Sequence, residues 1–77
     1  MSPTLLRKEG FKFFFYANEH KPRHIHIMKG DDYAKVNLES LEVKKNFFKP
    51  NEFKKVLKII NQHKDDFIRR WDEYFKR

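Results

Sequence analysis

At the centre of the predicted fold is the run Glu19-His20-Lys21-Pro22-Arg23-His24-Ile25-His26-Ile27. Pro22 cannot donate a ladder hydrogen bond, so a strand is expected to begin just after it. Successive side chains of a strand point to opposite faces, which puts His24 and His26 on one face and the two isoleucines on the other. We therefore expect the isoleucines to point to a core and the histidines to point away from it.

Three further segments have strand character. Residues 4–8 predict a short edge strand, and Glu9-Gly10 is expected to turn it into the aromatic run 11–16. After a second turn at Gly30-Asp31-Asp32, residues 33–39 show the clearest alternation of apolar and polar side chains in the chain.

The pairing of the histidine strand with residues 33–39 has two acceptable registers, because directly opposed residues share a face. A two-residue turn pairs His26 with Lys35 and His24 with Asn37. A four-residue turn pairs His26 with Asn37 and His24 with Glu39. Either register puts both histidines on one face with Lys35 and Asn37, away from the core.

From Asn51 to Lys76, apolar residues recur at three- and four-residue steps, which predicts an amphipathic helix. Pro50 suits a first helical turn, and Glu52 suits the positive end of the helix dipole. We expect one helix, with or without a bend, although a break near residues 61–63 would divide it into two. The recurring apolar residues are Phe53, Val56, Leu57, Ile60, Phe67, Trp71, Tyr74 and Phe75.

Strands followed by a helix predict an α+β fold, with a small antiparallel sheet of three to four strands covered on one face by the C-terminal helix. Residues 1–77 are expected to form a single domain, since the chain has no repeat, linker or low-complexity segment. The expected core consists of Ile25, Ile27, Ala34, Val36 and Leu38, packed under Phe53, Leu57, Ile60 and Phe67.

The composition narrows the classes of function. The chain has no cysteine, which excludes a disulfide or thiolate–metal framework. A formal net charge of +7 favours an anionic partner such as nucleic acid or an acidic protein. No secretory leader or membrane-spanning run is recognised, so we expect a cytoplasmic protein without membrane association.

Four segments carry a resemblance to a known family: Met1-Ser2-Pro3-Thr4, Gly10-Phe11-Lys12-Phe13-Phe14-Phe15-Tyr16, Pro22-Arg23-His24-Ile25-His26-Ile27 and Trp71-Asp72-Glu73-Tyr74-Phe75. On these segments the chain resembles the small bacterial proteins called domain of unknown function 4160. Members are commonly encoded beside another small protein, and such pairs are often labelled toxin–antitoxin modules. The resemblance therefore implies a partner protein from a neighbouring gene and an RNA-directed activity.

His24 and His26 are the candidate catalytic residues. Imidazole titrates near neutral pH, so one ring would accept a proton from a ribose 2′-hydroxyl while the other protonates the leaving oxygen. Lys35, Arg23 or Lys21 would stabilise charge on the phosphate. These roles describe a metal-independent ribonuclease. In the alternative interpretation, the histidines only pack against Tyr33 or a phenylalanine.

A metal site is a further hypothesis, because two histidine nitrogens share one strand face and His20, Glu19 or Glu39 would add a ligand. Structural zinc usually takes four protein ligands, and the chain reaches four here only if the preceding loop bends back. We therefore expect no metal and no other cofactor.

A non-catalytic module that binds a partner protein or nucleic acid is the alternative to an enzyme. Phe14 or Tyr16, if on the histidine face, would offer stacking platforms beside Lys12 and Lys35. Aromatic surface near the C-terminus would suit a partner or a second copy of the chain. The residues expected to contact phosphate or nucleic acid are Lys21, Arg23, Tyr33, Lys35 and Asn37.

Overall fold

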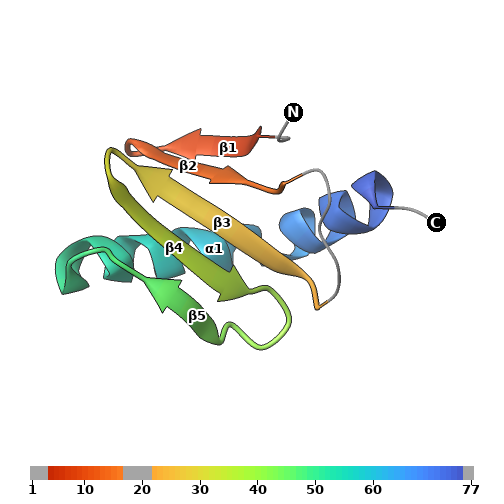
Figure 1. Cartoon of the computed structure of the whole chain (residues 1–77). Coiled ribbons are helices and arrows are strands. Elements are labelled where there is room, and N and C mark those ends of the chain that lie inside the picture. Colours follow the sequence, from red (N-terminus) through yellow and green to blue (C-terminus); the bar gives the residue numbers. More distant parts are fainter. Residues whose placement is uncertain (1–3, 17–21, 76–77) are drawn as a thin grey trace.

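Five strands and one helix make up the computed structural model, which describes residues 4–16 and 22–75. The strands form one antiparallel sheet in the order β1-β2-β3-β4-β5, and the helix follows them (Figure 1). The predicted α+β fold is confirmed, with five strands in place of three to four. The elements are β1 (Thr4–Lys8), β2 (Phe11–Phe14), β3 (His24–Lys29), β4 (Asp32–Asn37), β5 (Val43–Asn46) and α1 (Pro50–Tyr74).

Two tight turns set the register of the sheet. Glu9 and Gly10 join β1 to β2 with positive φ angles of 54° and 85°, as a type I′ hairpin turn requires. Gly30, with φ of 60°, begins the two-residue turn between β3 and β4 in the manner of a type II′ turn. The two-residue register is therefore correct: Ile27 lies opposite Ala34, and the four-residue alternative is wrong.

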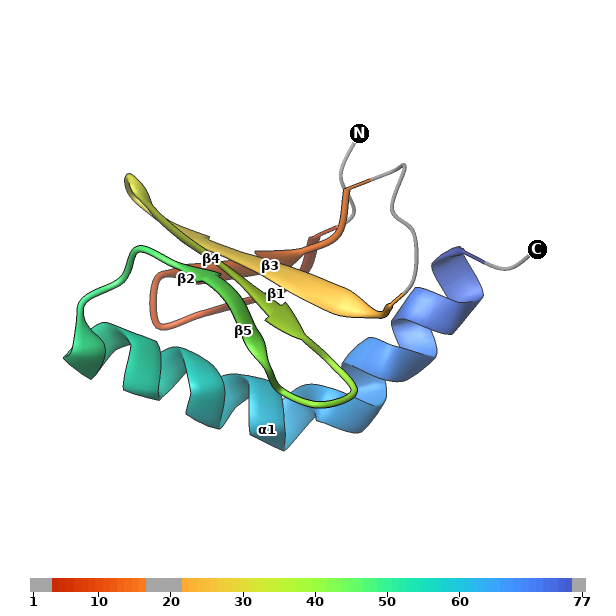
Figure 2. The same ribbon diagram turned by 60° about the horizontal axis from the view of Figure 1, so that its bottom comes forward.

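α1 lies across one face of the sheet, and its axis turns in its second half (Figure 2). The N–H of Phe53 donates to the carbonyl oxygen of Lys49 at 2.9 Å, which starts the helix around Pro50. The helix is continuous through residues 61–63, so the two-helix alternative is wrong. The helix ends at Tyr74, and its predicted end at residue 76 lies outside the described residues.

The core lies between α1 and the sheet face that it covers. The five predicted strand residues of the core are all buried. Phe13 stacks on Phe67 with ring centroids 5.8 Å apart, and Phe15 meets Trp71 edge-on at 5.0 Å. Leu57 was predicted to contribute fully, but it is only partly buried at the margin of the core.

Candidate functional site

The sheet face opposite α1 is not covered by any helix or strand of the described part of the chain (Figures 1 and 2). One cross-strand row runs over it from β2 to β5: Phe14 lies opposite His26, His26 opposite Lys35, and Lys35 opposite Lys45. Because opposed residues share a face, this row puts an aromatic ring, an imidazole and two ammonium groups side by side.

A second row runs beside the first. Lys12 lies opposite Met28, and Met28 lies opposite Tyr33. The N–H of Phe47 donates to the carbonyl oxygen of Tyr33 at 2.9 Å, which continues the β4–β5 ladder and places Phe47 opposite Tyr33. Phe47 therefore belongs to the same face, where 67 % of it is exposed.

We call this surface the open face. Two neighbours complete it at the ends of the rows, since Arg7 lies opposite Lys12 and the Tyr16 ring lies 4.5 Å from that of His26. The open face consists of Arg7, Lys12, Phe14, Tyr16, His24, His26, Met28, Tyr33, Lys35, Asn37, Lys45 and Phe47.

The His26 ring is buried in the middle of the open face, with 4 % exposure. The rings of Phe14 and Tyr33 stack on it at 5.5 and 5.8 Å, and Tyr16 meets it edge-on. Its Nδ1 atom lies 2.6 Å from the Tyr33 hydroxyl oxygen. The predicted face is correct, and the ring packs against Tyr33 and a phenylalanine as the alternative interpretation of the histidines described.

His24 is also buried, at 7 % exposure. Its ring lies 5.1 Å from that of His26 and 5.1 Å from that of Trp71, which reaches it from α1. Its Nδ1 lies 2.8 Å from the carbonyl oxygen of Pro22. A carbonyl only accepts, so Nδ1 carries the proton in this hydrogen bond. The Nε2 atom is buried, and a substrate proton would reach it only after the surrounding rings moved.

Arg23 faces two carboxylates. Its Nε donates to Asp72 at 2.8 Å, its Nη2 contacts the other oxygen of the same carboxylate at 3.2 Å, and its Nη1 contacts Glu39 at 3.3 Å. The hydrogen bond with Asp72 raises the pKa of Arg23 above its ordinary value. The guanidinium thus joins the start of β3 to the end of α1, and it is engaged where a phosphate contact was expected.

Asn37 serves the connection after β4. Its side-chain oxygen accepts hydrogen bonds from the backbone N–H groups of Glu39 at 2.7 Å and Ser40 at 3.0 Å. The side chain is 8 % exposed and its oxygen is already engaged. Its expected contact with nucleic acid would therefore have to use the NH2 group of the amide. Lys21, the remaining predicted phosphate contact, lies outside the described residues.

The open face carries positive charge without a balancing carboxylate in the described strands. Asp32 is the one acidic residue within the five strands. It lies opposite Lys29, whose Nζ reaches Glu52 of α1 at 3.0 Å, so strand parity places Asp32 on the covered side. The cationic residues of the open face are Arg7, Lys12, Lys35 and Lys45.

Among the described residues, no third ligand joins His24 and His26 to form a metal site. Within 4–16 and 22–75, no three histidine or acidic side chains gather as a metal site would require. Glu39, one of the proposed ligands, pairs with Arg23. The other two, Glu19 and His20, lie outside the described part of the chain.

Sequence reasoning missed three members of the open face, Arg7, Lys45 and Phe47. For Phe47 the sequence contains a usable signal in the adjacent pair Phe47-Phe48. In extended chain, neighbouring side chains point to opposite faces, so only one of the two rings can enter the core. Phe48 is buried and Phe47 is exposed.

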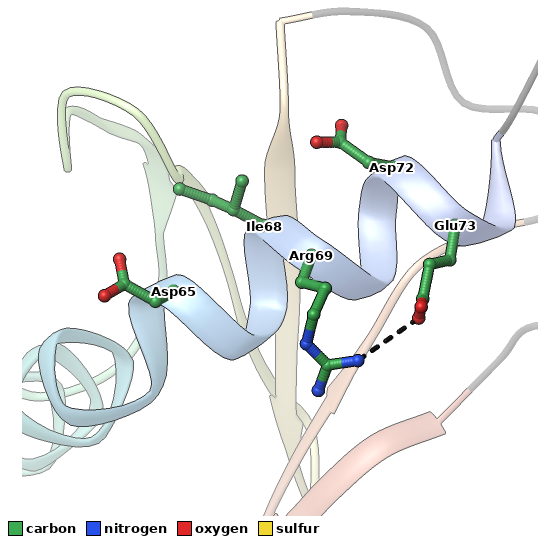
Figure 3. Close-up of a pocket in the computed structure, with 5 residues that line it drawn as sticks. All are labelled: Asp65, Ile68, Arg69, Asp72 and Glu73. Atoms are coloured by element: carbon green, nitrogen blue, oxygen red, sulfur yellow. Dashed lines mark hydrogen bonds and ion pairs between the residues drawn. The ribbon is translucent and has the colours of Figure 1, made fainter.

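A concavity of about 510 Å³ lies on the outer side of α1 (Figure 3). Its lining includes Arg69, which pairs with Glu73 at 3.4 Å, and Ile68. Asp65 and Asp72 bring further negative charge, so this hollow does not suit an anionic ligand. None of its lining residues belongs to the open face.

Comparison with known proteins identifies one family. The model of the family described as Domain of unknown function (DUF4160) matches residues 10–72. No curated protein and no solved structure matches the chain. Among the described residues, no helix is both long enough and apolar enough to cross a membrane.

Proposed function

The chain belongs to the family described as Domain of unknown function (DUF4160), and we propose that its open face binds nucleic acid. The observation that carries the proposal is the composition of this face: four cationic side chains stand among aromatic rings, without a carboxylate from the described strands. Phosphates are attracted by such a charge distribution, and exposed rings offer surfaces to bases.

In this proposal His26 positions the surface and does not transfer a proton. Its burial and its contact with the Tyr33 hydroxyl support this role. The ring fills the space between β2 and β4 and keeps Tyr33 beside Lys35. The two ammonium groups of Lys35 and Lys45 then contact phosphate.

Metal-independent RNA cleavage is the second candidate. It is favoured by one distance, the 5.1 Å between the ring centroids of His24 and His26, with Lys35 directly opposite the second ring. An acid, a base and a cation within one site would suffice for the reaction. We place either activity in a cytoplasmic toxin–antitoxin-like module with a protein partner from a neighbouring gene, as the family resemblance implies.

The test compares two double variants that remove equal charge. The double variant Lys35→Ala/Lys45→Ala removes two cations from the open face. The double variant Lys54→Ala/Lys58→Ala removes two exposed lysines from α1. Binding to a labelled single-stranded RNA is measured by fluorescence anisotropy over a salt series. We expect the first pair to make the slope of log K against log salt less negative by about 1.4, at about 0.7 per phosphate contact.

The α1 variants should keep the slope of the wild type. Equal losses from both double variants would mean that only net charge matters, and the proposal would be abandoned. The RNA recovered from the same samples is run on a denaturing gel. If the wild type cleaves the RNA and folded His24→Ala and His26→Ala variants do not, the ribonuclease function would be adopted in place of the binding function.

A further inference from the structure

We infer that the nucleic acid taken by the open face is single-stranded, and that its unpaired bases stack on Phe47 and Tyr16. This inference rests on the proposed function and deepens it. It uses a property of the face that charge alone does not explain, namely that two of its rings stand in solvent while the others are packed.

Phe47 is 67 % exposed and Tyr16 is 43 % exposed. In contrast, Phe14 is 3 % exposed and lies beneath the Lys12 ammonium, 5.1 Å from its ring centroid. A solvent-exposed phenylalanine gains nothing from a duplex, whose base faces are already stacked on one another. A base that is free of pairing can cover such a ring, and this contact accepts any base because each has a π-face.

Cations lie where the phosphates of that strand would pass. Lys45 is two residues from Phe47 in the chain and directly opposite Lys35, and Lys12 lies in the next row beside Phe14. From β2 to β5 the face spans three strand spacings, about 14 Å. That width suits about two or three bases, the number that other open sheets stack.

The charge of the face decides between a nucleic acid and a partner protein. Exposed rings also suit a protein interface, but such interfaces are depleted in lysine at their centre. Here Lys35 and Lys45 lie in the row next to Tyr33 and Phe47. A polyanion with flat apolar groups satisfies both features together, and a single-stranded nucleic acid is such a polymer.

The experiment measures the affinity of three probes with equal phosphate number: an oligouridylate RNA, the oligothymidylate DNA and a blunt RNA duplex. We expect the single strands to bind at least about tenfold more tightly than the duplex, in line with the value of base stacking. Phe47→Ala should weaken single-strand binding about 5- to 100-fold and leave duplex binding unchanged. Tyr16→Ala should act in the same direction.

Tyr74→Ala is the matched control, since Tyr74 is 48 % exposed on α1, away from the open face. Circular dichroism confirms that each variant is folded. Equal affinity for duplex and single strand, or an unchanged affinity in Phe47→Ala, would overturn the inference while the proposed function stood. Failure to bind any of the probes would instead overturn the proposed function. Tighter binding of RNA than of DNA would assign the ligand to RNA, and equal binding would leave strandedness as the recognised property.

Discussion

The contact between His26 and Tyr33 explains why a polar ring occupies the middle of the open face. Burying an imidazole without a hydrogen bond would be costly, and the Tyr33 hydroxyl at 2.6 Å supplies one. The stacked rings of Phe14 and Tyr33 cover the carbon atoms of the imidazole. The Nδ1 atom of His26 thus has a hydrogen-bond partner, and the faces of its ring are packed. These side chains form a small core on the open face.

The first consequence concerns stability. We expect His26→Ala to lower the free energy of unfolding by about 2–5 kcal/mol, as emptied core sites do, because the ring is 4 % exposed. Tyr33→Phe keeps the ring and removes the hydroxyl, which takes the partner from a buried nitrogen, so its cost should be about 1–3 kcal/mol. Urea denaturation of both variants and of the double variant gives the coupling between them. A His26→Ala midpoint equal to that of the wild type would contradict the packing described here.

Alternation along one strand was enough to predict on which side of the sheet His24 and His26 lie. It was not enough to predict their burial. The rings that cover them come from β2 and the residues just after it, from β4 and from α1. Alternation within β3 contains no information about the size of side chains on other segments. Arg23 illustrates the same limit, since its carboxylate partner Asp72 is 49 residues away in the chain.

At the level of the elements, α1 is the part that the sequence predicted best. Its apolar period selects one side, and Phe53, Val56, Ile60, Phe67 and Trp71 are buried as the spacing requires. Leu57 lies at the edge of that stripe and stays partly exposed, while Ile59, which the pattern did not select, faces the sheet. The apolar period therefore predicts the centre of the buried stripe. Which residues at its border are buried also depends on the shape of the sheet beneath the helix.

Alanine substitutions along α1 test this boundary. Ile60→Ala should cost about 2–5 kcal/mol because the side chain is fully buried, and Leu57→Ala should cost clearly less. Lys58→Ala, at the exposed position between them, is the control and should stay within about 0.5 kcal/mol of the wild type. Guanidinium denaturation measures all three. A larger loss from Leu57→Ala than from Ile60→Ala would mean that the helix faces the sheet through another side.

β5 is the element that the sequence did not predict. Val43-Lys44-Lys45-Asn46 has one apolar residue and no alternation, and all four residues are exposed. An edge strand held by one neighbour needs no apolar face, so the pattern by which strands are recognised is absent. Lys45 and Phe47, in and just after this strand, were missed as members of the open face for this reason.

For the molecule as a whole, the two layers separate charge as well as burial. The open face carries cations without carboxylates in its described strands, while α1 balances six basic residues with five acidic ones, among them Asp65, Asp66, Asp72 and Glu73. The four cations of the open face therefore exceed the net charge of +1 on α1. This separation favours one orientation of an approaching polyanion before any contact forms.

An ion pair between the layers makes their association sensitive to pH. Lys29 at the end of β3 donates to Glu52 in the first turn of α1 at 3.0 Å. This hydrogen bond lowers the pKa of Glu52 below its ordinary value of 4.5. The folded protein thus keeps the carboxylate ionised where the unfolded chain would bind a proton. The stabilisation is present above about pH 4.5 and is lost as the pH falls through the lowered pKa of the folded state.

Glu52→Gln removes this titration and keeps the shape of the side chain. We expect the variant to be less stable than the wild type at neutral pH and to lose less on acidification, so that the two melting temperatures converge below about pH 4. Glu73→Gln removes the same charge from a solvent-exposed pair with Arg69 near the end of α1 and is the control for net charge. Thermal denaturation followed by circular dichroism from neutral to acidic pH measures both. Parallel curves for the wild type and Glu52→Gln would show that acid acts through the overall positive charge and that the contact between the layers makes no separate contribution.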